Sequence, residues 1–272
     1  MSMVRMIFIV VLPLIAQTGP APQGVAPLLQ AHAHNDYLHD PPLLQALAHG
    51  FASVEADIFL VGDKLCVAHE AKKVTPERTL QSLYLEPLRQ RVKENEGRVY
   101  RGASRFILLI DIKTAAEPTY RRLHEVLAGY QDMLTTFDSQ GRKNKAILVV
   151  VSGNRPLKLM QSQPVRYAGY DGRLPDLNSD LSADVIPMIS DQWVKPFTWK
   201  GEGPMPQEER QRLNDIVRRA HAQGRLVRFW LTPDDPSRER DAVWRELLAA
   251  DVDLINTDDL KGLQEFLLRH GR

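Results

Sequence analysis

The chain alternates short apolar segments with longer segments of helical periodicity, and this alternation constrains the fold more than any other feature. The segments 146–152 and 226–231 are the clearest of the short ones, because both are nearly continuous runs of aliphatic or aromatic residues. Such runs are typical of parallel strands that are buried on both faces. Strands that alternate with helices favour an α/β fold, here a single-domain (β/α)8 TIM barrel, for which 272 residues are an ordinary length. The expected strands are 28–34, 52–59, 105–112, 146–152, 166–169, 185–190, 226–231 and 252–257.

Helix-patterned segments separate these strands. Leu260, Leu263 and Leu267, for example, repeat at helical spacing. The segment 162–205 is rich in Pro, Gly, Asp and Ser and shows no clear helix after the fifth strand, so we expect long loops over the mouth of the barrel there. The expected helices are 42–49, 76–95, 117–131, 155–161, 206–223, 237–249 and 258–269.

The first 24 residues differ in composition from the rest of the chain. Arg5 precedes an apolar run at 6–16, and a segment with Gly and Pro follows it. This is the layout of a secretory signal, and the run is shorter than the ~20 residues that span a bilayer. We therefore expect residues 1–24 to be a signal peptide and linker of a secreted or periplasmic protein, or a membrane anchor if uncleaved. Residues 25–272 are the expected barrel domain.

Charge and cysteine content exclude two classes of protein. The formal net charge of +1 gives no general attraction to nucleic acid, so no nucleic-acid partner is expected. Cys66 is the only cysteine, so no intrachain disulfide can form. The oligomeric state does not follow from the sequence.

Polar clusters follow the first three expected barrel strands. A charged group at the end of a buried strand costs several kcal/mol unless it is paired, so such clusters indicate a site. Active sites in this architecture lie at the C-terminal ends of the strands. A turn at 62–64 predicts a small hairpin that carries one histidine back over the end of the second strand. The clusters are His32-Ala-His34-Asn35-Asp36, Glu55-Ala-Asp57, His69 on the hairpin, and Asp111-Ile-Lys113.

Three of these residues are acids that form a predicted metal site. Glu55 and Asp57 are one residue apart, so on an extended strand both side chains point the same way, and Asp111 has the matching position on the next strand. Carboxylates that face one another raise each other's pKa unless a cation intervenes. An oxygen-rich set of this kind suits one Mg²⁺ or Ca²⁺. The alternative is a salt-bridged network with Lys113 and arginines, although burying three acids for structure alone is seldom favourable.

The histidines add acid–base chemistry to this site. His32 and His34 share a face of the first strand, and His69 is expected across the cavity from them. Two imidazoles on opposite sides of a phosphorus atom allow one to take a proton from the attacking oxygen while the other gives one to the leaving oxygen. A divalent cation withdraws charge from the phosphoryl group. The pattern predicts a metal-assisted site for cleaving phosphodiesters.

Other polar and aromatic residues are expected around the same mouth. Lys113 has the position to balance the acids or to hold a phosphate oxygen. Trp230, at the end of the seventh strand, is expected either to pack on the lipid or alcohol portion of a substrate or to plug the barrel. Asn256, at the end of the eighth strand, completes the rim.

The phrase Ala31-His-Ala-His-Asn-Asp-Tyr37, followed by Ser53-Val-Glu-Ala-Asp57, resembles the superfamily of phosphatidylinositol-specific phospholipases C and glycerophosphodiester phosphodiesterases. It is particularly similar to the branch of the fungal altered-inheritance-of-mitochondria proteins and their bacterial relatives. Sphingomyelinase D enzymes show a similar order of a strand-end His, an acid pair, a hairpin His and Asp-x-Lys. The resemblance covers about 28–268. It implies a TIM barrel and a phosphodiesterase that acts on a phospholipid or a glycerophosphodiester-like substrate, with transient contact to a membrane surface.

The resemblance also implies roles for individual residues. The doublet leaves the first catalytic histidine open between His32 and His34, and we favour His32 because Asn35 then lies three residues on, as in the sphingomyelinase-like pattern. The His-Arg-Gly and Pro-Glu-Asn-Thr signatures of typical glycerophosphodiesterases are absent, so specificity for glycerophosphodiesters does not follow. The implied roles are His32 (or His34) and His69 as catalytic, Glu55, Asp57 and Asp111 as metal ligands, and Lys113 and Trp230 as substrate contacts. Asn35 and Asn256 are further expected substrate contacts.

Two other functions are compatible with parts of the sequence. A metal-dependent amidohydrolase would use His32 and His34 as a metal pair and Asp258 as a late acid, but it needs further histidines on the middle strands, which contain none. A non-catalytic lipid or cell-envelope binding barrel would keep the fold and lose an acid or a histidine, and none is lost here. Whether water or a neighbouring substrate hydroxyl attacks, giving hydrolysis or a cyclic phosphate, stays open.

Overall fold

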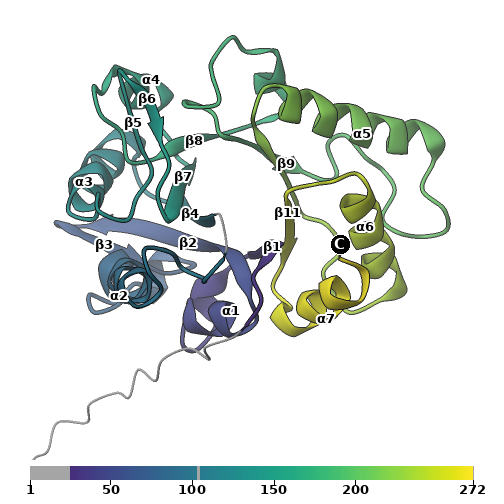
Figure 1. The fold of residues 1–272 in the computed structure, drawn as a ribbon, viewed down its shortest axis with the longest axis horizontal. Coiled ribbons are helices and arrows are strands. Elements are labelled where there is room, and N and C mark those ends of the chain that lie inside the picture. The colour runs from purple at the N-terminus through teal and green to yellow at the C-terminus, as the bar shows by residue number, and fades with distance from the viewer. Residues whose placement is uncertain (1–24, 103–104, 272) are drawn as a thin grey trace, which may run out of the picture.

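The computed structural model describes residues 25–102 and 105–271. Eight parallel strands form a closed barrel, because the first strand pairs with both the second and the last. The single-domain (β/α)8 barrel expected from the sequence is therefore confirmed (Figure 1), whereas the expected signal peptide at 1–24 lies outside the described residues. In order around the barrel, the strands are β1 (Leu28–Ala33), β2 (Phe51–Val61), β4 (Phe106–Ile112), β7 (Ile147–Gly153), β8 (Gly169–Gly172), β9 (Met188–Gln192), β10 (Leu226–Trp230) and β11 (Leu254–Thr257).

Helices surround the barrel on its outer side (Figure 1). No helix in the described part of the chain is both long enough and apolar enough to cross a bilayer. A 3-10 helix, η4 (Leu174–Asn178), takes the place of an α-helix between β8 and β9. The α-helices are α1 (Leu44–Ala48), α2 (Glu86–Glu94), α3 (Ala116–Ala128), α4 (Leu157–Ser162), α5 (Gln207–Ala222), α6 (Arg238–Ala249) and α7 (Leu260–His270), and a π-helical turn, η3 (Gln81–Leu85), precedes α2.

Two excursions leave the barrel. The predicted hairpin is confirmed, because β3 (Lys64–Val67) runs antiparallel to the far end of β2. A second hairpin, β5 (Thr136–Asp138) with β6 (Gly141–Lys143), was not expected from the sequence.

Two strands lie about three residues later than predicted. The structure starts β8 at Gly169 and β9 at Met188, because Arg166 instead forms a bridge with Phe137 in β5. Glycine has low strand propensity, yet Gly169 is required here: a Cβ at this position would lie 2.3 Å from a carbon of Pro187. Packing against the next segment thus overrides local propensity.

The loops of 162–205 do not all cover the mouth, in contrast to the expectation. Arg225 lies just before β10, at the N-terminal end of the barrel, and its guanidinium donates to the carbonyls of Asp176 and Leu181. The segment between β8 and β9 therefore runs along the outer wall to the opposite end. The segment 193–206, in contrast, follows the C-terminal end of β9 and leads into α5.

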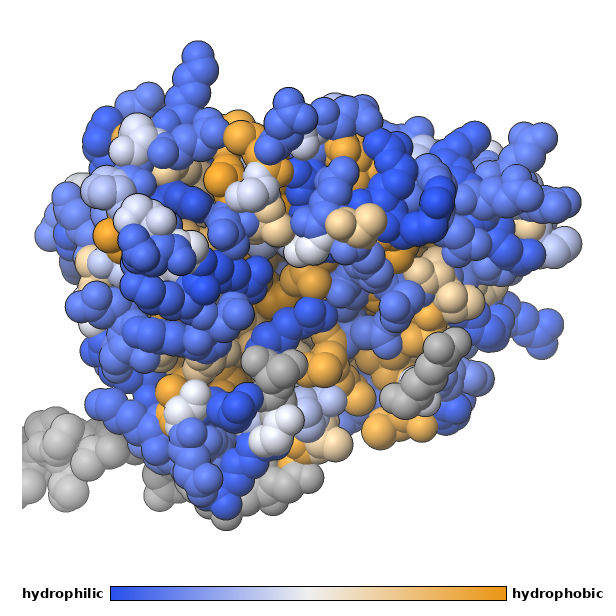
Figure 2. Space-filling model, turned by 45° about the horizontal axis from the view of Figure 1, so that its top comes forward, coloured by the Kyte–Doolittle hydropathy of each residue, from blue (hydrophilic) through white to orange (hydrophobic). Residues whose placement is uncertain are grey.

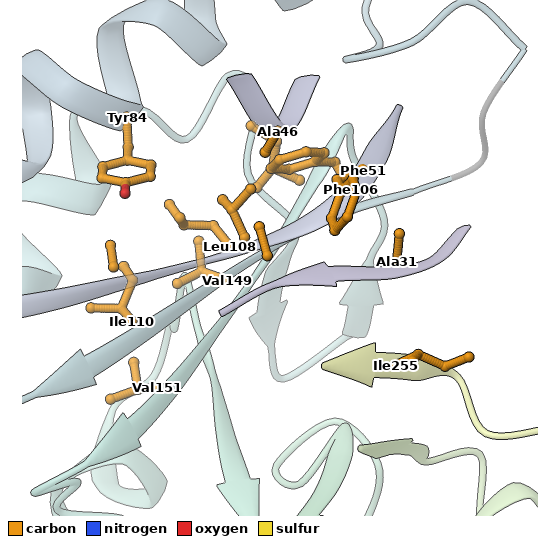
Figure 3. Packing of buried hydrophobic residues seen from close by; sticks show 14 of the residues in the cluster. Ala31, Ala46, Phe51, Tyr84, Phe106, Leu108, Ile110, Val149, Val151 and Ile255 are labelled. Carbon is orange, nitrogen blue, oxygen red and sulfur yellow. The ribbon is translucent and has the colours of Figure 1, made fainter. Parts of the chain in front are cut away.

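Alternating side chains of the strands form two separate cores. Outward residues pack under the helices in the larger core, and Figure 3 shows Phe106 and Leu108 of β4 and Val149 of β7 in it. Inward residues such as Leu109 and Val150 form a smaller cluster at the floor of the barrel interior. Towards the C-terminal ends of the strands the inward positions become polar, so the floor is apolar and the mouth is charged. The inward polar residues include His32, Ser53, Glu55, Asp57, Asp111, Ser152, Asp171, Ser190, Arg228 and Asn256, all but Asp111 buried.

A buried carboxylate ties the loop after β1 to the helical segment before α2. Asp36 Oδ2 accepts hydrogen bonds from the Leu43 backbone N–H (2.7 Å) and from the Tyr84 hydroxyl (2.8 Å). Its other oxygen is buried and has no hydrogen-bond partner. Burial raises the pKa of Asp36 to about 7, although the two hydrogen bonds oppose this rise.

We expect the Asp36→Asn variant to be more stable than the wild type near pH 8, by about 2 kcal/mol. The unfolded chain loses this proton near pH 4 and the folded chain near pH 7, so the carboxylate lowers stability increasingly as pH rises between those values. Urea unfolding near pH 4 and near pH 8 measures the effect, which should be small at the lower pH. Asp180→Asn, at an exposed position, is the control and should change stability at neither pH. A variant that is no more stable at pH 8 than the wild type would contradict this electrostatic account.

Candidate active site

The three predicted metal ligands come together at the mouth of the barrel. Asp57 of β2 lies directly beside Asp111 of β4 in the sheet register, and Glu55 precedes Asp57 on the same face of β2. One carboxylate oxygen from each of the three residues lies within 4.8 Å of the others. Glu55 and Asp57 are buried, and Asp111 is partly exposed. The geometry therefore allows the three acids to share one ion.

The charges of these acids are only partly balanced within the chain. Burial and the charge of Glu55 raise the pKa of Asp57 to about 7, and burial also raises the pKa of Asp111. The Lys113 ammonium lies 3.1 Å from Asp57 Oδ2 and 3.1 Å from Asp111 Oδ1. Asp57 Oδ1 is buried without a hydrogen-bond partner. Oxygen donors that repel one another and include a free buried oxygen fit a hard divalent cation.

A buried arginine that the sequence analysis did not assign lies next to this set. Arg228 Nη2 donates to Glu55 Oε2 at 2.7 Å, and the guanidinium also donates to Asn256 Oδ1 and Ser190 Oγ. A charged residue within the otherwise apolar run of β10 was the available signal, because such a residue needs a buried partner. Arg228 and the attractive hydrogen bond of His32 together hold the pKa of Glu55 below its usual range, against the effect of burial.

His32 is buried below the mouth of the barrel. It has no exposed surface, its Nδ1 lies 2.7 Å from Ser53 Oγ, and its Nε2 lies 3.3 Å from Glu55 Oε2. Burial and the nearby Arg228 lower its pKa to about 3, so the ring is neutral. The structure thus gives His32 a supporting contact to Glu55, and the preference for His32 over His34 as the catalytic histidine stays a prediction.

His34 is the member of the doublet that lies at the mouth. Its side chain is 30% exposed, and its Nδ1 lies 2.8 Å from Asp258 Oδ1 on the loop after β11. Burial alone would lower the pKa of His34, but the hydrogen bond to Asp258 and the negative charges of Glu55 and Asp258 together outweigh burial and raise the pKa above its ordinary value. Asn35 donates to the same carboxylate. Asp258 thus orients the His34 ring through one nitrogen and leaves the other free.

Tyr37 links the acids to the histidine on the hairpin, and the sequence analysis did not assign it. Its hydroxyl lies 2.7 Å from Asp57 Oδ2, 2.6 Å from Asn35 Oδ1 and 2.9 Å from His69 Nδ1. The rings of Tyr37 and His69 are also stacked, with centroids 6.1 Å apart. His69 therefore lies beside the acids, as expected, and its side chain is 47% exposed.

The other predicted substrate contacts differ in accessibility. Lys113 is partly exposed at the rim, and Trp230 is partly buried at the end of β10 on the same face as Arg228. Asn256 is buried, and its oxygen accepts from Arg228, so the structure gives it a contact within the protein. Asn35 likewise bonds to neighbouring side chains.

Polar contacts continue around the mouth past Asp111. Ser152 Oγ donates to Asp171 Oδ2 at 2.7 Å, and Arg173 Nη1 donates to the same oxygen at 2.6 Å. Asp191 of the next strand, β9, pairs with Lys195 in the segment that follows that strand. The mouth therefore combines hydroxyl, carboxylate and cationic groups along β7, β8 and β9.

A family model described as the AIM6-like phosphodiesterase domain matches residues 21–171, more than half of the chain. The chain belongs to the AIM6-like phosphodiesterase family. A model of the glycerophosphoryl diester phosphodiesterase family matches residues 227–261. The altered inheritance of mitochondria protein 6 homolog of Arthroderma benhamiae is 30% identical over 90% of this chain and 85% of that protein. Its counterpart in Eremothecium gossypii is 30% identical over 90% of this chain and 71% of that protein. The resemblance inferred from the sequence is confirmed.

Two solved structures share the fold of this AIM6-like chain. A glycerophosphoryl diester phosphodiesterase from Parabacteroides distasonis has a TM-score of 0.52 at 14% identity and covers 89% of this chain and 87% of its own. A calcium-dependent phosphoinositol-specific phospholipase C from a Pseudomonas species has a TM-score of 0.51 at 13% identity. The match covers 84% of this chain and 87% of the phospholipase chain. The family's domain is a phosphodiesterase domain and the barrel agrees with it, so phosphodiester hydrolysis is the supported reaction class.

The metal pair of an amidohydrolase is not formed. Within the described residues, the one group of three close His, Cys, Asp or Glu ligands is Glu55, Asp57 and Asp111. His32 and His34 instead contact different acids, Glu55 and Asp258. This separation disfavours the amidohydrolase hypothesis.

We expect Gly153→Ala to displace Asp111 and to weaken divalent-ion binding by about tenfold or more. A Cβ on Gly153 would lie 2.1 Å from Asp111 Oδ1. Gly141→Ala is the matched control, because Gly141 also has a positive φ but has nothing within 4 Å of the added carbon. Calorimetric titration with Ca²⁺ measures the affinity, and thermal unfolding measures the backbone strain that both variants share. Equal Ca²⁺ affinity in the two variants would show that the close approach of Gly153 to Asp111 does not shape the ion site.

Proposed function

We propose that the protein is a metal-dependent phosphodiesterase in which Glu55, Asp57 and Asp111 hold one Mg²⁺ or Ca²⁺. The observation that carries the proposal is the close set of three carboxylates, with Lys113 at its edge and His34 and His69 beside it. When bound, the ion withdraws charge from the phosphoryl group. The calcium dependence named for the phospholipase C neighbour is a property of that protein, and it agrees with this choice of ion.

His34 and His69 form the acid–base pair of the proposal. Asp258 fixes one nitrogen of His34, and Tyr37 fixes one nitrogen of His69, so each ring keeps its other nitrogen for the substrate. One imidazole takes the proton of the attacking oxygen, and the other protonates the leaving oxygen. This assignment replaces His32 by His34 because His32 has no accessible atom.

Lys113 is proposed to hold a phosphate oxygen. Its side chain is 31% exposed, and it bonds to Asp57 and Asp111 at one end of a flexible stem. A divalent ion at the acids would replace these contacts, because the ammonium and the ion compete for the same oxygens. The ammonium can then turn towards the substrate as a point charge.

The substrate class is proposed to be a phospholipid or a glycerophosphodiester-like ester, with Trp230 against its apolar or alcohol portion. The surface drawn in Figure 2 is mainly hydrophilic, with hydrophobic residues in small patches. Leu38 and Leu231 are more than half exposed and follow the C-terminal ends of β1 and β10. These two residues support a transient contact with a membrane surface. Secretion is proposed from the leader-like segment 1–24 alone.

We expect His34→Ala and His69→Ala each to lower turnover of bis(p-nitrophenyl) phosphate by about 10²-fold or more. EDTA should abolish release of p-nitrophenol, and Mg²⁺ or Ca²⁺ should restore it. His270→Ala, exposed at the end of α7, is the matched control and should keep full activity. His32→Ala should lower the melting temperature, and its folded fraction should lose less turnover than His34→Ala loses.

Two results would contradict these assignments. Activity that resists both EDTA and His69→Ala would refute the metal-dependent phosphodiesterase. A larger loss of turnover in His32→Ala than in His34→Ala would restore the assignment favoured by the sequence pattern. Lipid binding without turnover of any substrate would instead indicate the non-catalytic barrel. Detection of a cyclic phosphate by ³¹P NMR with a lysophospholipid would identify a substrate hydroxyl as the attacking group.

A further inference from the structure

Arg228 is a permanent cation at the base of the acid set. Its side chain is 4% exposed, and Glu55 is the one carboxylate that it contacts among the described residues. Asn256 and Ser190 accept its remaining hydrogen bonds from the adjacent strands β11 and β9. A guanidinium stays charged at any pH that the protein tolerates. Arg228 therefore cannot lose its charge or leave its position without disrupting three strands.

The second cation near the acids, Lys113, has the opposite character. It lies at the rim, is 31% exposed, and has a long flexible stem. An incoming ion can displace it from Asp57 and Asp111. The fixed charge of the proposed ion site is therefore that of the three carboxylates and Arg228 together, which sums to −2 when all three acids are ionised. This value equals the charge of one divalent ion with the sign reversed.

Arg228 also contacts one particular oxygen of Glu55. Arg228 and His32 both contact Oε2 of Glu55, at 2.7 and 3.3 Å. Because Arg228 and His32 both bind Oε2, Oε1 is the Glu55 oxygen that remains for an ion. The same two contacts keep the Glu55 carboxylate in place when no ion is bound.

We propose that Arg228 is a positioning residue with two effects. Its charge brings the total charge of the three acids and Arg228 to −2, which matches one divalent ion, and its hydrogen bond holds Glu55 in place for that ion. The inference rests on the metal-dependent function proposed above. It differs from a purely structural salt bridge, because a structural bridge would affect folding and leave the choice of ion unchanged.

The test measures ion binding by the whole protein, apart from turnover. Calorimetric titrations with Ca²⁺, Mg²⁺ and La³⁺, together with thermal unfolding with and without each ion, are carried out on the wild type, Arg228→Met and Arg228→Lys. Arg225→Met is the matched control, because Arg225 is equally buried and bonds to backbone carbonyls at the opposite end of β10. Arg228→Gln serves in place of the Met variant if that variant does not fold.

We expect Arg228→Met to bind La³⁺ more tightly relative to Ca²⁺ than the wild type does, by about tenfold. Removing a fixed positive charge favours the trivalent ion over the divalent one. The variant should also unfold at a lower temperature without an ion and gain more from Ca²⁺ than the wild type gains. Arg228→Lys should keep the wild-type ratio of affinities, and Arg225→Met should lose stability without changing that ratio.

Two outcomes overturn the inference, and they are distinguishable. If the wild type binds Ca²⁺ but Arg228→Met has the wild-type ratio of La³⁺ to Ca²⁺ affinity, only the role of Arg228 is overturned. Absence of Ca²⁺ and Mg²⁺ binding by the wild type overturns the metal-dependent function and this inference with it.

Discussion

Closure of the barrel forces every inward side chain of eight strands into one narrow interior, and the site depends on how that interior is filled. The floor is apolar, with residues such as Leu109 and Val150, and the polar side chains lie above it. Charges that rest on a low-dielectric floor interact more strongly than charges in water. Burial in this environment, to which the charge of Glu55 adds, raises the pKa of Asp57 and Asp111. In the same environment Lys113 and Arg228 pair with these acids, which offsets part of the cost of burying them.

The site is supported by contacts that come from distant parts of the chain. Asp258, after the last strand, orients His34 after the first, and Tyr37 joins the loop after β1 to the hairpin histidine. Each catalytic candidate thus has a partner that fixes one ring nitrogen, which is the arrangement that proton transfer requires. Because the barrel is closed, the segments after its first and last strands become neighbours, which brings Asp258 to His34.

The sequence was sufficient to predict the barrel, the hairpin and the acid set, because strand periodicity decides which side chains share a face. The sequence was insufficient to predict how far below the mouth each inward side chain lies. His32 and His34 share one face of the first strand, and only the three-dimensional structure shows that His32 lies against Ser53 below the mouth. Arg228 was overlooked because its run resembles an apolar strand. The predicted start of the strand at Gly169 was wrong because Gly169 is required by packing against Pro187, which no local pattern reveals.

The hairpin formed by β2 and β3 extends beyond the barrel rim, since Val61 pairs with Lys64 past the last contact between β2 and β4 at Ile58. His69 therefore depends on an appendage, whereas the acids depend on the wall. A longer hairpin tip would leave the barrel pairing intact. It would reshape the entrance, and with it the size of the molecule that is admitted, without moving the three acids of the wall.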